Sequence, residues 1–370
     1  MIARAGVVAW KELRQLRRDR MTLAMMTALP VMQLLLFGYA INTDVRHIPT
    51  VIYDQDRSAA SRDLARSLEA TRYYDVVGAV RNYDEIDAAL RSNAARVALV
   101  IPARFGSDTA RHKPTTVQLV VDGSDPQIVA SATNTAASLV AARSAELVVT
   151  GGASRAQPIS LEPATWYNPD LRTAVFVVPG LVGVILTMTM VMLTSMAIVR
   201  ERERGTLEQL IVSPVKSLEI VIGKIAPYIG LGYVQVTLIL VAGRLIFGVP
   251  FVGSVGLLYA LAFVFIAANL ALGLMFSTVA KTQQQAMQMS FFFLLPNILL
   301  SGFMFPFEAM PHPAQWIGQL LPLTHFLRIV RGIALKGAVF SDLRGELVSL
   351  LLILGVLIAI SALRFRKRLG

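Results

Sequence analysis

Long stretches without acidic or basic residues are the feature that most constrains the fold of this chain. A helix that crosses the hydrocarbon core of a bilayer needs about 20 apolar residues. Six stretches have that length and character: residues 21–41, 173–199, 225–246, 255–279, 286–307 and 347–363. The third carries Arg244 near its end, where a long side chain reaches the headgroups. The sequence therefore predicts an α-helical polytopic membrane protein with six transmembrane helices.

Composition supports the membrane class and excludes several kinds of chemistry. Charged residues make up 16% of the chain, whereas soluble domains carry about 25%. The net charge of +11 comes from residues spread over the ends of the spans and a polar domain, without an aromatic-rich basic stripe. This pattern favours a membrane surface over nucleic acid as the partner. The chain has no cysteine, which excludes disulfides, thiolate metal sites and thiol nucleophiles.

The distribution of lysine and arginine predicts the orientation in the membrane. Basic residues gather in segments 1–20 and 200–224, at Lys281 and in the C-terminal tail, whereas the short segment 248–254 has none. Because short basic segments stay in the cytoplasm, we expect both termini inside. Apolar residues recur at roughly helical spacing over 1–20, as in an amphipathic helix lying in the interface. A plain basic flank of the first span is the alternative.

Residues 42–172 form a long polar insertion between the first two spans, which the topology places outside the cytoplasm. Apolar runs typical of strands alternate there with helical patterns. Expected strands lie at 50–53, 75–80, 96–101 and 116–121, and expected helices at 59–70 (capped by Ser58), 83–91 and 126–149. This alternation predicts an inserted extracytoplasmic α/β domain.

The chain contains little that indicates catalysis. Asp54 and Asp56 form an Asp-x-Asp pair, but acidic residues that follow a strand and precede a helix more often make a turn than a metal site. The four histidines lack metal-ligand spacing. The phosphate-binding pattern G-x-x-x-x-G-K-[ST] does not occur, and the spans lack the buried carboxylates of an ion-driven carrier. Energy for any transport must then come from a partner.

One link stands apart from the others. Residues 200–214 read RERERGTLEQLIVSP, a dense cluster of mixed charge followed by a short amphipathic turn directly after a hydrophobic span. Paired charges of both signs suit the docking of a soluble protein in a fixed register. A solvated amphipathic link without a partner is the alternative.

Three motifs give the whole chain a resemblance to a known family. They are Trp166-Tyr167-Asn168-Pro169 before the second span, Arg202-Glu203-Arg204-Gly205-Thr206-Leu207-Glu208 after it, and Ser301-Gly302-Phe303-Met304-Phe305-Pro306 at the end of the fifth. With the order of one span, a large external domain and five further spans, the chain resembles the permease subunits of type-2 ABC exporters (the ABC-2 permease family). Within that family it is similar to the large-external-domain branch of bacterial multidrug efflux permeases.

The resemblance implies partners and a location. A separate cytoplasmic ABC ATPase would bind ATP and magnesium, so that this chain binds no cofactor itself, and a second permease subunit, identical or paralogous, would complete the complex. Residues 200–220 would form the coupling helix. Its ATPase-coupling residues would be Glu201, Arg202, Glu203, Arg204, Gly205, Thr206, Glu208 and Gln209. The location would be the bacterial inner membrane, with an envelope adaptor and outer-membrane channel as further partners.

The resemblance also implies a transport path between spans two and five. Candidate cavity residues are Thr187, Met188, Met192, Phe291, Phe292 and Asn297, and candidate outer-gate residues are Phe303, Phe305 and Pro306. Segment 310–340 would be a re-entrant lid. An apolar lining rich in methionine and phenylalanine suits drug-like or lipid-like cargo. A non-transporting sensor that signals through its external domain is the main alternative, and a membrane-embedded lipid enzyme is a third hypothesis.

Overall fold

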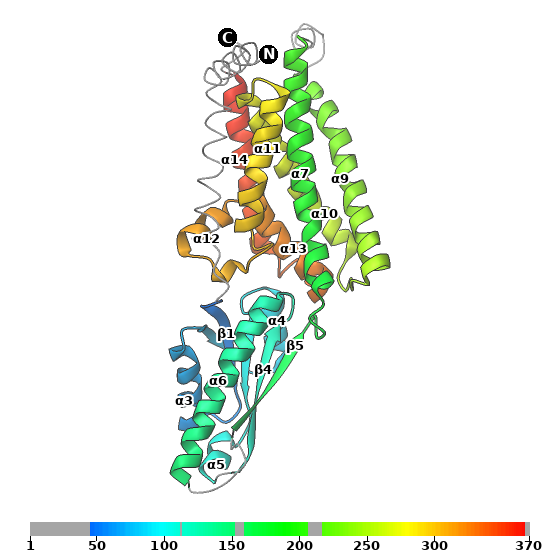
Figure 1. The fold of residues 1–370 in the computed structure, drawn as a ribbon. Helices are drawn as coiled ribbons and strands as arrows, with labels where there is room; N and C mark the ends of the chain where they lie inside the picture. Colours follow the sequence, from blue (N-terminus) through cyan, green and yellow to red (C-terminus); the bar gives the residue numbers. More distant parts are fainter. Residues whose placement is uncertain (1–44, 112, 152–158, 206–216, 367–370) are drawn as a thin grey trace, which may run out of the picture.

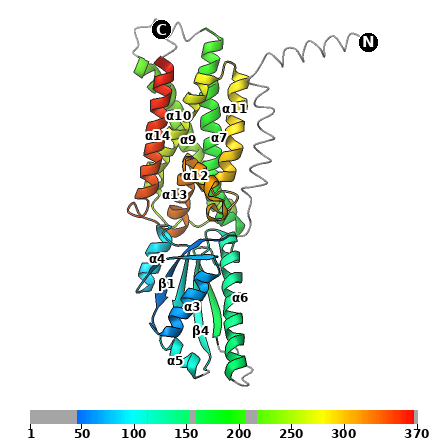
Figure 2. The ribbon, with the colours of Figure 1, turned by 90° about the vertical axis from the view of Figure 1, so that its left-hand side faces the viewer.

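The computed structural model describes residues 45–111, 113–151, 159–205 and 217–366. Figures 1 and 2 show an elongated molecule in which an α/β domain stands at one end of a bundle of long helices. The helix expected over 1–20 and the first span, expected over 21–41, lie outside the described residues.

The α/β domain is built on a five-stranded mixed sheet. Its strands are β1 (Ile48–Asp54), β2 (Tyr74–Ala79), β3 (Val97–Ile101), β4 (Thr115–Asp122) and β5 (Ile159–Trp166). The order in the sheet is β2-β1-β3-β4-β5, with β3 and β4 antiparallel and all other neighbours parallel. The prediction of an α/β domain is therefore confirmed, although β5 was not expected.

Helices cover both faces of this sheet. They are α3 (Ala59–Ala70), α4 (Tyr83–Arg91), α5 (Phe105–Ala110) and α6 (Pro126–Gly151). The expected cap of α3 is confirmed, because the Ser58 hydroxyl accepts a hydrogen bond from the Ser61 amide at 3.1 Å. The helix α5 was missed, since its sequence FGSDTA has no apolar period.

Alternate residues of the central strands enter two separate cores, as the period of two of a strand requires. Val97 and Leu99 pack with α3, α5 and α6 on one face. Ala98 and Val100 pack with Ile86 and Leu90 of α4 on the other face. The domain is thus a three-layer sandwich with its sheet buried on both sides.

Seven α-helices form the described part of the bundle. They are α7 (Thr173–Glu203), α9 (Ser217–Phe247), α10 (Val255–Val279), α11 (Gln283–Leu300), α12 (His312–Gln319), α13 (Pro322–Lys336) and α14 (Arg344–Arg366). Four of the described helices are long and apolar enough to cross a membrane: Thr173–Glu203, Ala226–Phe247, Val255–Val279 and Arg344–Leu363. The described chain is therefore mostly a helical membrane-type protein. α11 does not meet the same criterion, because its first turn consists of three glutamines.

Several predicted boundaries differ from those of the helices. The fifth span, expected over 286–307, ends at Leu300, and the chain then turns at Gly302, whose φ is +83°. Pro296 lies inside this continuous helix and does not break it. The first residues expected in a coupling helix over 200–220 are the last turn of α7, and its last residues are the first turn of α9. Charge-free runs mark the hydrocarbon region, whereas a helix continues into the headgroup region as long as its backbone bonds are satisfied.

α7 is the central helix of the bundle and packs against α9, α10, α11 and α13. Its closest approach to α10 depends on Gly273, where an added Cβ would lie 2.8 Å from the carbonyl oxygen of Val191. Phe265 of α10 and Phe326 of α13 stack with ring centroids 4.0 Å apart. Small residues at crossings and stacked rings between them are typical of membrane helix packing, where close contact replaces the hydrophobic effect.

Candidate functional site: the two ends and the central seam of the bundle

The end of α7 farthest from the α/β domain is tied to the turn between α10 and α11 (Figure 1). The backbone amide and the side-chain amide of Gln283 donate to the two carboxylate oxygens of Glu203, at 3.0 and 2.5 Å. Arg200 donates to the Gln283 side-chain oxygen at 3.0 Å, and Arg202 donates to the Ala280 carbonyl at 3.0 Å. We call these five residues the charged clasp. It links the ends of two helices, and two of its members, Arg202 and Glu203, are also candidate coupling residues.

The candidate coupling residues are only partly described. Glu201, Arg202 and Glu203 belong to the last turn of α7. Arg204 is the C-cap, and Gly205 follows with a φ of +68°, a left-handed conformation that ends the helix and favours glycine. Thr206, Glu208 and Gln209 lie outside the described residues. The structure thus explains why a glycine follows the charge cluster, and the docking role stays a prediction.

α7 and α11 run antiparallel and meet along a seam that contains polar side chains. The hydroxyls of Ser195 and Ser290 lie 3.3 Å apart. Asn297 lies seven residues on from Ser290 along the same face of α11, whereas Thr187 lies eight residues back from Ser195 along α7, about 80° around that helix. Both are 1% exposed. The Thr187 hydroxyl and both amide atoms of Asn297 have no hydrogen-bond partner among the described residues.

The other four candidate cavity residues are less buried. Met188, Met192 and Phe292 are half-buried, and Phe291 is 48% exposed. A separate apolar groove of about 410 Å³ lies between α7 and α9, and the residues that line it include none of the six candidates. The described structure brings Ser195 and Ser290 together between α7 and α11, and the assignment of the six candidates to a transport path stays a prediction.

The three candidate outer-gate residues lie in the turn that follows α11. The ring of Phe303 covers Gly180 of α7, where an added Cβ would lie 2.7 Å from two ring carbons. Phe305 packs beside the cluster formed by Leu300, Met310 and Leu321, and Pro306 is buried. The turn is thus folded back onto the bundle at its junction with the α/β domain.

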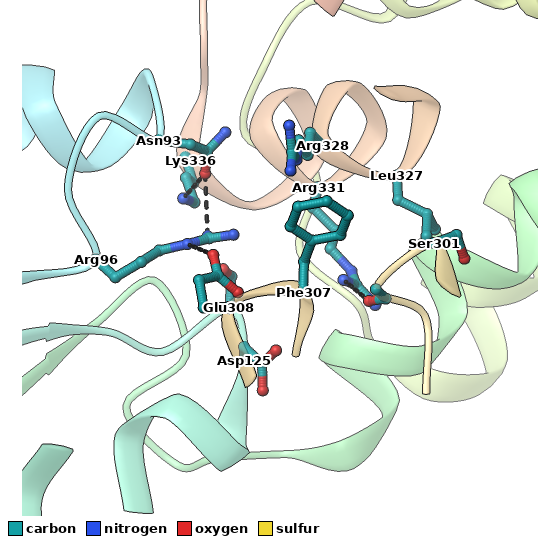
Figure 3. Close-up of a pocket in the computed structure, with 12 residues that line it drawn as sticks. Asn93, Arg96, Asp125, Ser301, Phe307, Glu308, Leu327, Arg328, Arg331 and Lys336 are labelled. Carbon is teal, nitrogen blue, oxygen red and sulfur yellow. Dashed lines mark hydrogen bonds and ion pairs between the residues drawn. The ribbon is translucent and has the colours of Figure 1, made fainter. Parts of the chain in front are cut away.

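A cluster of buried charges joins the α/β domain to this turn and to α13 (Figure 3). Lys336, the last residue of α13, pairs with Asp122 at the end of β4, with nitrogen and oxygen 2.6 Å apart and both side chains 1% exposed. Arg96 contacts Asp122 at 2.8 Å and Glu308 at 3.0 Å. We call Arg96, Asp122, Glu308 and Lys336, with Asn93 between them, the junction cluster.

The electrostatics of the junction cluster keep its ion pairs charged at neutral pH. Burial lowers the pKa of the Lys336 ammonium to about 8, against the attraction of Asp122. Burial would raise the pKa of Asp122, but Lys336 and Arg96 outweigh it and hold that pKa well below its usual range. For the neighbouring Asp125 burial prevails, and the pKa is raised.

The junction cluster escaped prediction from the sequence. The available signal was an excess of cations on an otherwise apolar helix: Arg328, Arg331 and Lys336 in α13. Buried cations of this kind need acidic partners. Their position in the fold could not be deduced, because Lys336 and Asp122 are 214 residues apart in the sequence.

The described residues contain no group of three or more His, Asp or Glu side chains placed to hold a metal ion. The Asp54 carboxylate instead accepts the Asp56 and Arg57 amides at 3.0 and 2.9 Å, and Asp56 accepts the Gly106 amide at 2.8 Å. These bonds are those of a turn after a strand, as the sequence favours.

Comparisons with known proteins agree with this architecture. A model of the ABC-2 family transporter proteins matches residues 20–363. The probable multidrug ABC transporter permease YbhR of Escherichia coli is 31% identical over 368 residues that cover 100% of both chains. The permease YbhS of the same organism is 28% identical, covering 99% of this chain and 97% of its own. The inner membrane transport permease YhhJ is 29% identical, covering 97% and 96%. The chain therefore belongs to the ABC-2 transporter family and is one of its permeases.

Proposed function

We propose that this chain is the membrane-spanning subunit of an ATP-driven exporter that moves a hydrophobic or amphiphilic molecule outward. The observation that carries this proposal is the charged clasp, which overlaps the first residues of the expected docking segment and ties α7 to α11. A displacement of the segment that follows Gly205 would move α7 and α11 together, because Glu203 of α7 and Gln283 of α11 are joined by two hydrogen bonds. These are the two helices expected to line the path.

The proposed cycle alternates access around the α7–α11 seam. A separate ATPase subunit docks on residues 201–209, and its closure on ATP separates or rotates the two helices relative to a second permease subunit. Thr187 and Asn297 would then meet cargo with atoms that have no hydrogen-bond partner among the described residues. A buried amide without a partner is costly, so an uncharged cargo that offers it a hydrogen bond would be bound in preference to a plain hydrocarbon.

The chemistry of the seam and the names of the relatives support this substrate class. α11 carries no charged residue, and α7 carries none from Thr173 to Val199, which disfavours a strongly ionic cargo. YbhR and YbhS carry the description of probable multidrug permeases. Drug-like or lipid-like molecules fit both observations.

We place the chain in a bacterial inner membrane, with residues 42–172 on the outer side, where an envelope adaptor leading to an outer-membrane channel would reach them. The absence of cysteine allows a direct test in intact cells. A cysteine at Ser107 should react with an impermeant maleimide, whereas a cysteine at Ser213 should react only after lysis. The reverse pattern would contradict the proposed orientation.

The transport role is tested by reconstituting the chain with its ATPase in proteoliposomes and measuring ATP-dependent movement of an uncharged fluorescent amphiphile. Glu208→Lys should abolish both ATPase binding and transport, since it reverses a charge in the proposed docking segment. Glu69→Lys, on an exposed helix of the α/β domain, is the matched control and should behave like the parent. Normal transport by Glu208→Lys would contradict the docking proposal. ATP hydrolysis that responds to an external protein without any movement of cargo would favour the sensor hypothesis.

A further inference from the structure

Lys336 is fully used as a hydrogen-bond donor, and all of its acceptors belong to the α/β domain. Its ammonium group donates to the Leu90 carbonyl at 2.8 Å, the Asn93 side-chain oxygen at 2.7 Å and the Asp122 carboxylate at 2.6 Å. A lysine has three protons to donate, so each one has a partner. The position at the end of α13 adds a favourable interaction with the helix dipole.

Arg96 forms a second connection from the α/β domain to the bundle, at the turn after α11. It donates to Asn93 at 3.0 Å and Asp122 at 2.8 Å, the two side chains that also accept from Lys336. Its third bond, 3.0 Å long, goes to Glu308 in the turn after α11 (Figure 3). Next to Glu308, Ala309 is 8% exposed and packs in the main core of the α/β domain. The α/β domain therefore contacts both α13 and the turn that precedes α12.

α13 in turn contacts the rest of the bundle. The backbone amides of Val252 and Gly253, between α9 and α10, donate to the carbonyls of Ala334 and Ile333 at 2.9 and 3.0 Å. Arg331 donates to the Gly302 carbonyl at 3.0 Å, and its guanidinium lies 4.1 Å from the centre of the Phe176 ring of α7. Residues 301–336, which we call the outer segment, are thus held to the α/β domain on one side and to the spans on the other.

Separating the α/β domain from the outer segment would break the three hydrogen bonds of Lys336 and the bond between Arg96 and Glu308, and it would remove Ala309 from the core of the α/β domain. A partial separation that leaves one of these charges buried without its partner is strongly unfavourable. Motion of the outer segment alone is therefore disfavoured as a way of opening the exit. Motion of the outer segment together with the α/β domain leaves every bond of the junction cluster intact.

We propose that Lys336 is a positioning residue that locks the α/β domain to the outer segment, so that the two move as one body whenever the exit opens. The proposal rests on the proposed export function for its setting. The rigid connection itself concerns this chain alone and can be measured without transport.

The cysteine-free chain allows a direct distance measurement. Spin labels at Ser138→Cys on α6 and Gln319→Cys on α12, both exposed, report the position of the domain relative to the outer segment. Labelled chains are diluted with unlabelled chains so that distances within one chain dominate, and double electron–electron resonance is recorded in lipid nanodiscs. The distribution is expected to be narrow and the same in the nucleotide-free complex and in the complex trapped with ATP and vanadate. A shift between these two states would overturn the proposal.

Variants test the role of Lys336 itself. Lys336→Met should broaden the distribution and lower the cargo moved per ATP hydrolysed, whereas Lys336→Arg should largely restore both. Lys113→Met, at an exposed lysine of the α/β domain, is the matched control and should change neither. If Lys336→Met does not fold, Asn93→Ala removes an acceptor that Lys336 and Arg96 share and should broaden the distribution more mildly. An unchanged distribution in these variants would contradict the locking role. A complex that fails to transport but keeps a Lys336-dependent distance would reject the export function and leave the lock standing.

Discussion

The close contact between α7 and α10 at Gly273 predicts that alanine there lowers the stability of the bundle, whereas alanine at the matched control glycine, Gly355, raises it. Alanine at Gly273 would place its Cβ 2.8 Å from the carbonyl oxygen of Val191 and 2.8 Å from the Cβ of Thr194. Ordinary contacts begin at 3.4 Å, so the two helices would have to separate by about 0.6 Å. The obstructing atoms cannot swing away, because one belongs to the backbone and the other is fixed to it.

The expected effect is a loss of stability. Forcing an extra methyl group into a packed interface costs about 1–3 kcal/mol, whereas replacing a helical glycine by alanine gains about 0.5–1 kcal/mol. Gly273→Ala should therefore destabilise the bundle by about 1 kcal/mol, the difference between the middle values of these two ranges. Gly355 of α14 has no atom within 4 Å of an added Cβ. Gly355→Ala should therefore stabilise the bundle by about 0.5–1 kcal/mol, because the added methyl group meets no neighbouring atom.

Thermal unfolding in detergent separates the two outcomes. Ser277, which is 0% exposed in α10, is replaced by cysteine in the parent and in both variants, and a thiol-reactive dye then reports its exposure on heating. The midpoint should fall for Gly273→Ala and stay equal or rise for Gly355→Ala. A Gly273→Ala midpoint at or above that of the parent would show that the two helices do not pack as closely as described.

Three further predictions concern the clasp, the junction and the seam. Gln283→Ala keeps the backbone bond to Glu203 but removes the side-chain bond and the oxygen that accepts from Arg200; it should lower the cargo moved per ATP while ATPase binding, measured by co-purification, is retained. Asp125→Asn should raise the melting temperature at neutral pH. Burial raises the pKa of the Asp125 carboxyl in the folded state, so its ionisation, which begins above its ordinary pKa of about 4, destabilises the fold as the pH rises. The higher melting temperature of the Asn variant should therefore vanish below pH 4. Asn297→Leu should stabilise the fold by about 1–3 kcal/mol by removing buried atoms without partners, and it should weaken transport if that amide meets cargo. Unchanged transport with greater stability would make Asn297 a structural residue only.

The sequence predicts the kinds of element well and their ends poorly. The helix α10 has the expected bounds because a serine cap precedes it and the charge-free run ends with it. The helix of the second expected span, α7, continues four residues past its apolar run to Glu203. Arginine and glutamate are good helix formers, and the headgroup region tolerates them. β5 was missed because Pro163 and Glu162 interrupt its apolar pattern. Proline is tolerated there because β5 is an edge strand, with one side free of ladder bonds.

Contacts across long sequence separations account for most of what could not be predicted. The outer-gate turn was expected to be helical up to residue 307, because nothing in its apolar composition shows that Arg331 would hold the Gly302 carbonyl. The partners of Lys336 lie on two separate segments of another domain, the end of α4 with the turn after it and the end of β4. A sequence shows that a buried cation needs acceptors, and only the fold decides which ones are near.

The length of α7 has a consequence for how the two sides of the membrane influence each other. Its 31 residues extend about 46 Å at 1.5 Å per residue, more than the roughly 30 Å of the hydrocarbon core. One helix therefore runs from the neighbourhood of β5 to Glu203 without a break. If events at its two ends are coupled, thermodynamic linkage makes the coupling reciprocal. An antibody fragment that tightens on the α/β domain when the ATPase binds must then raise the affinity of the ATPase by the same factor, and either measurement alone would give the coupling energy of the complex.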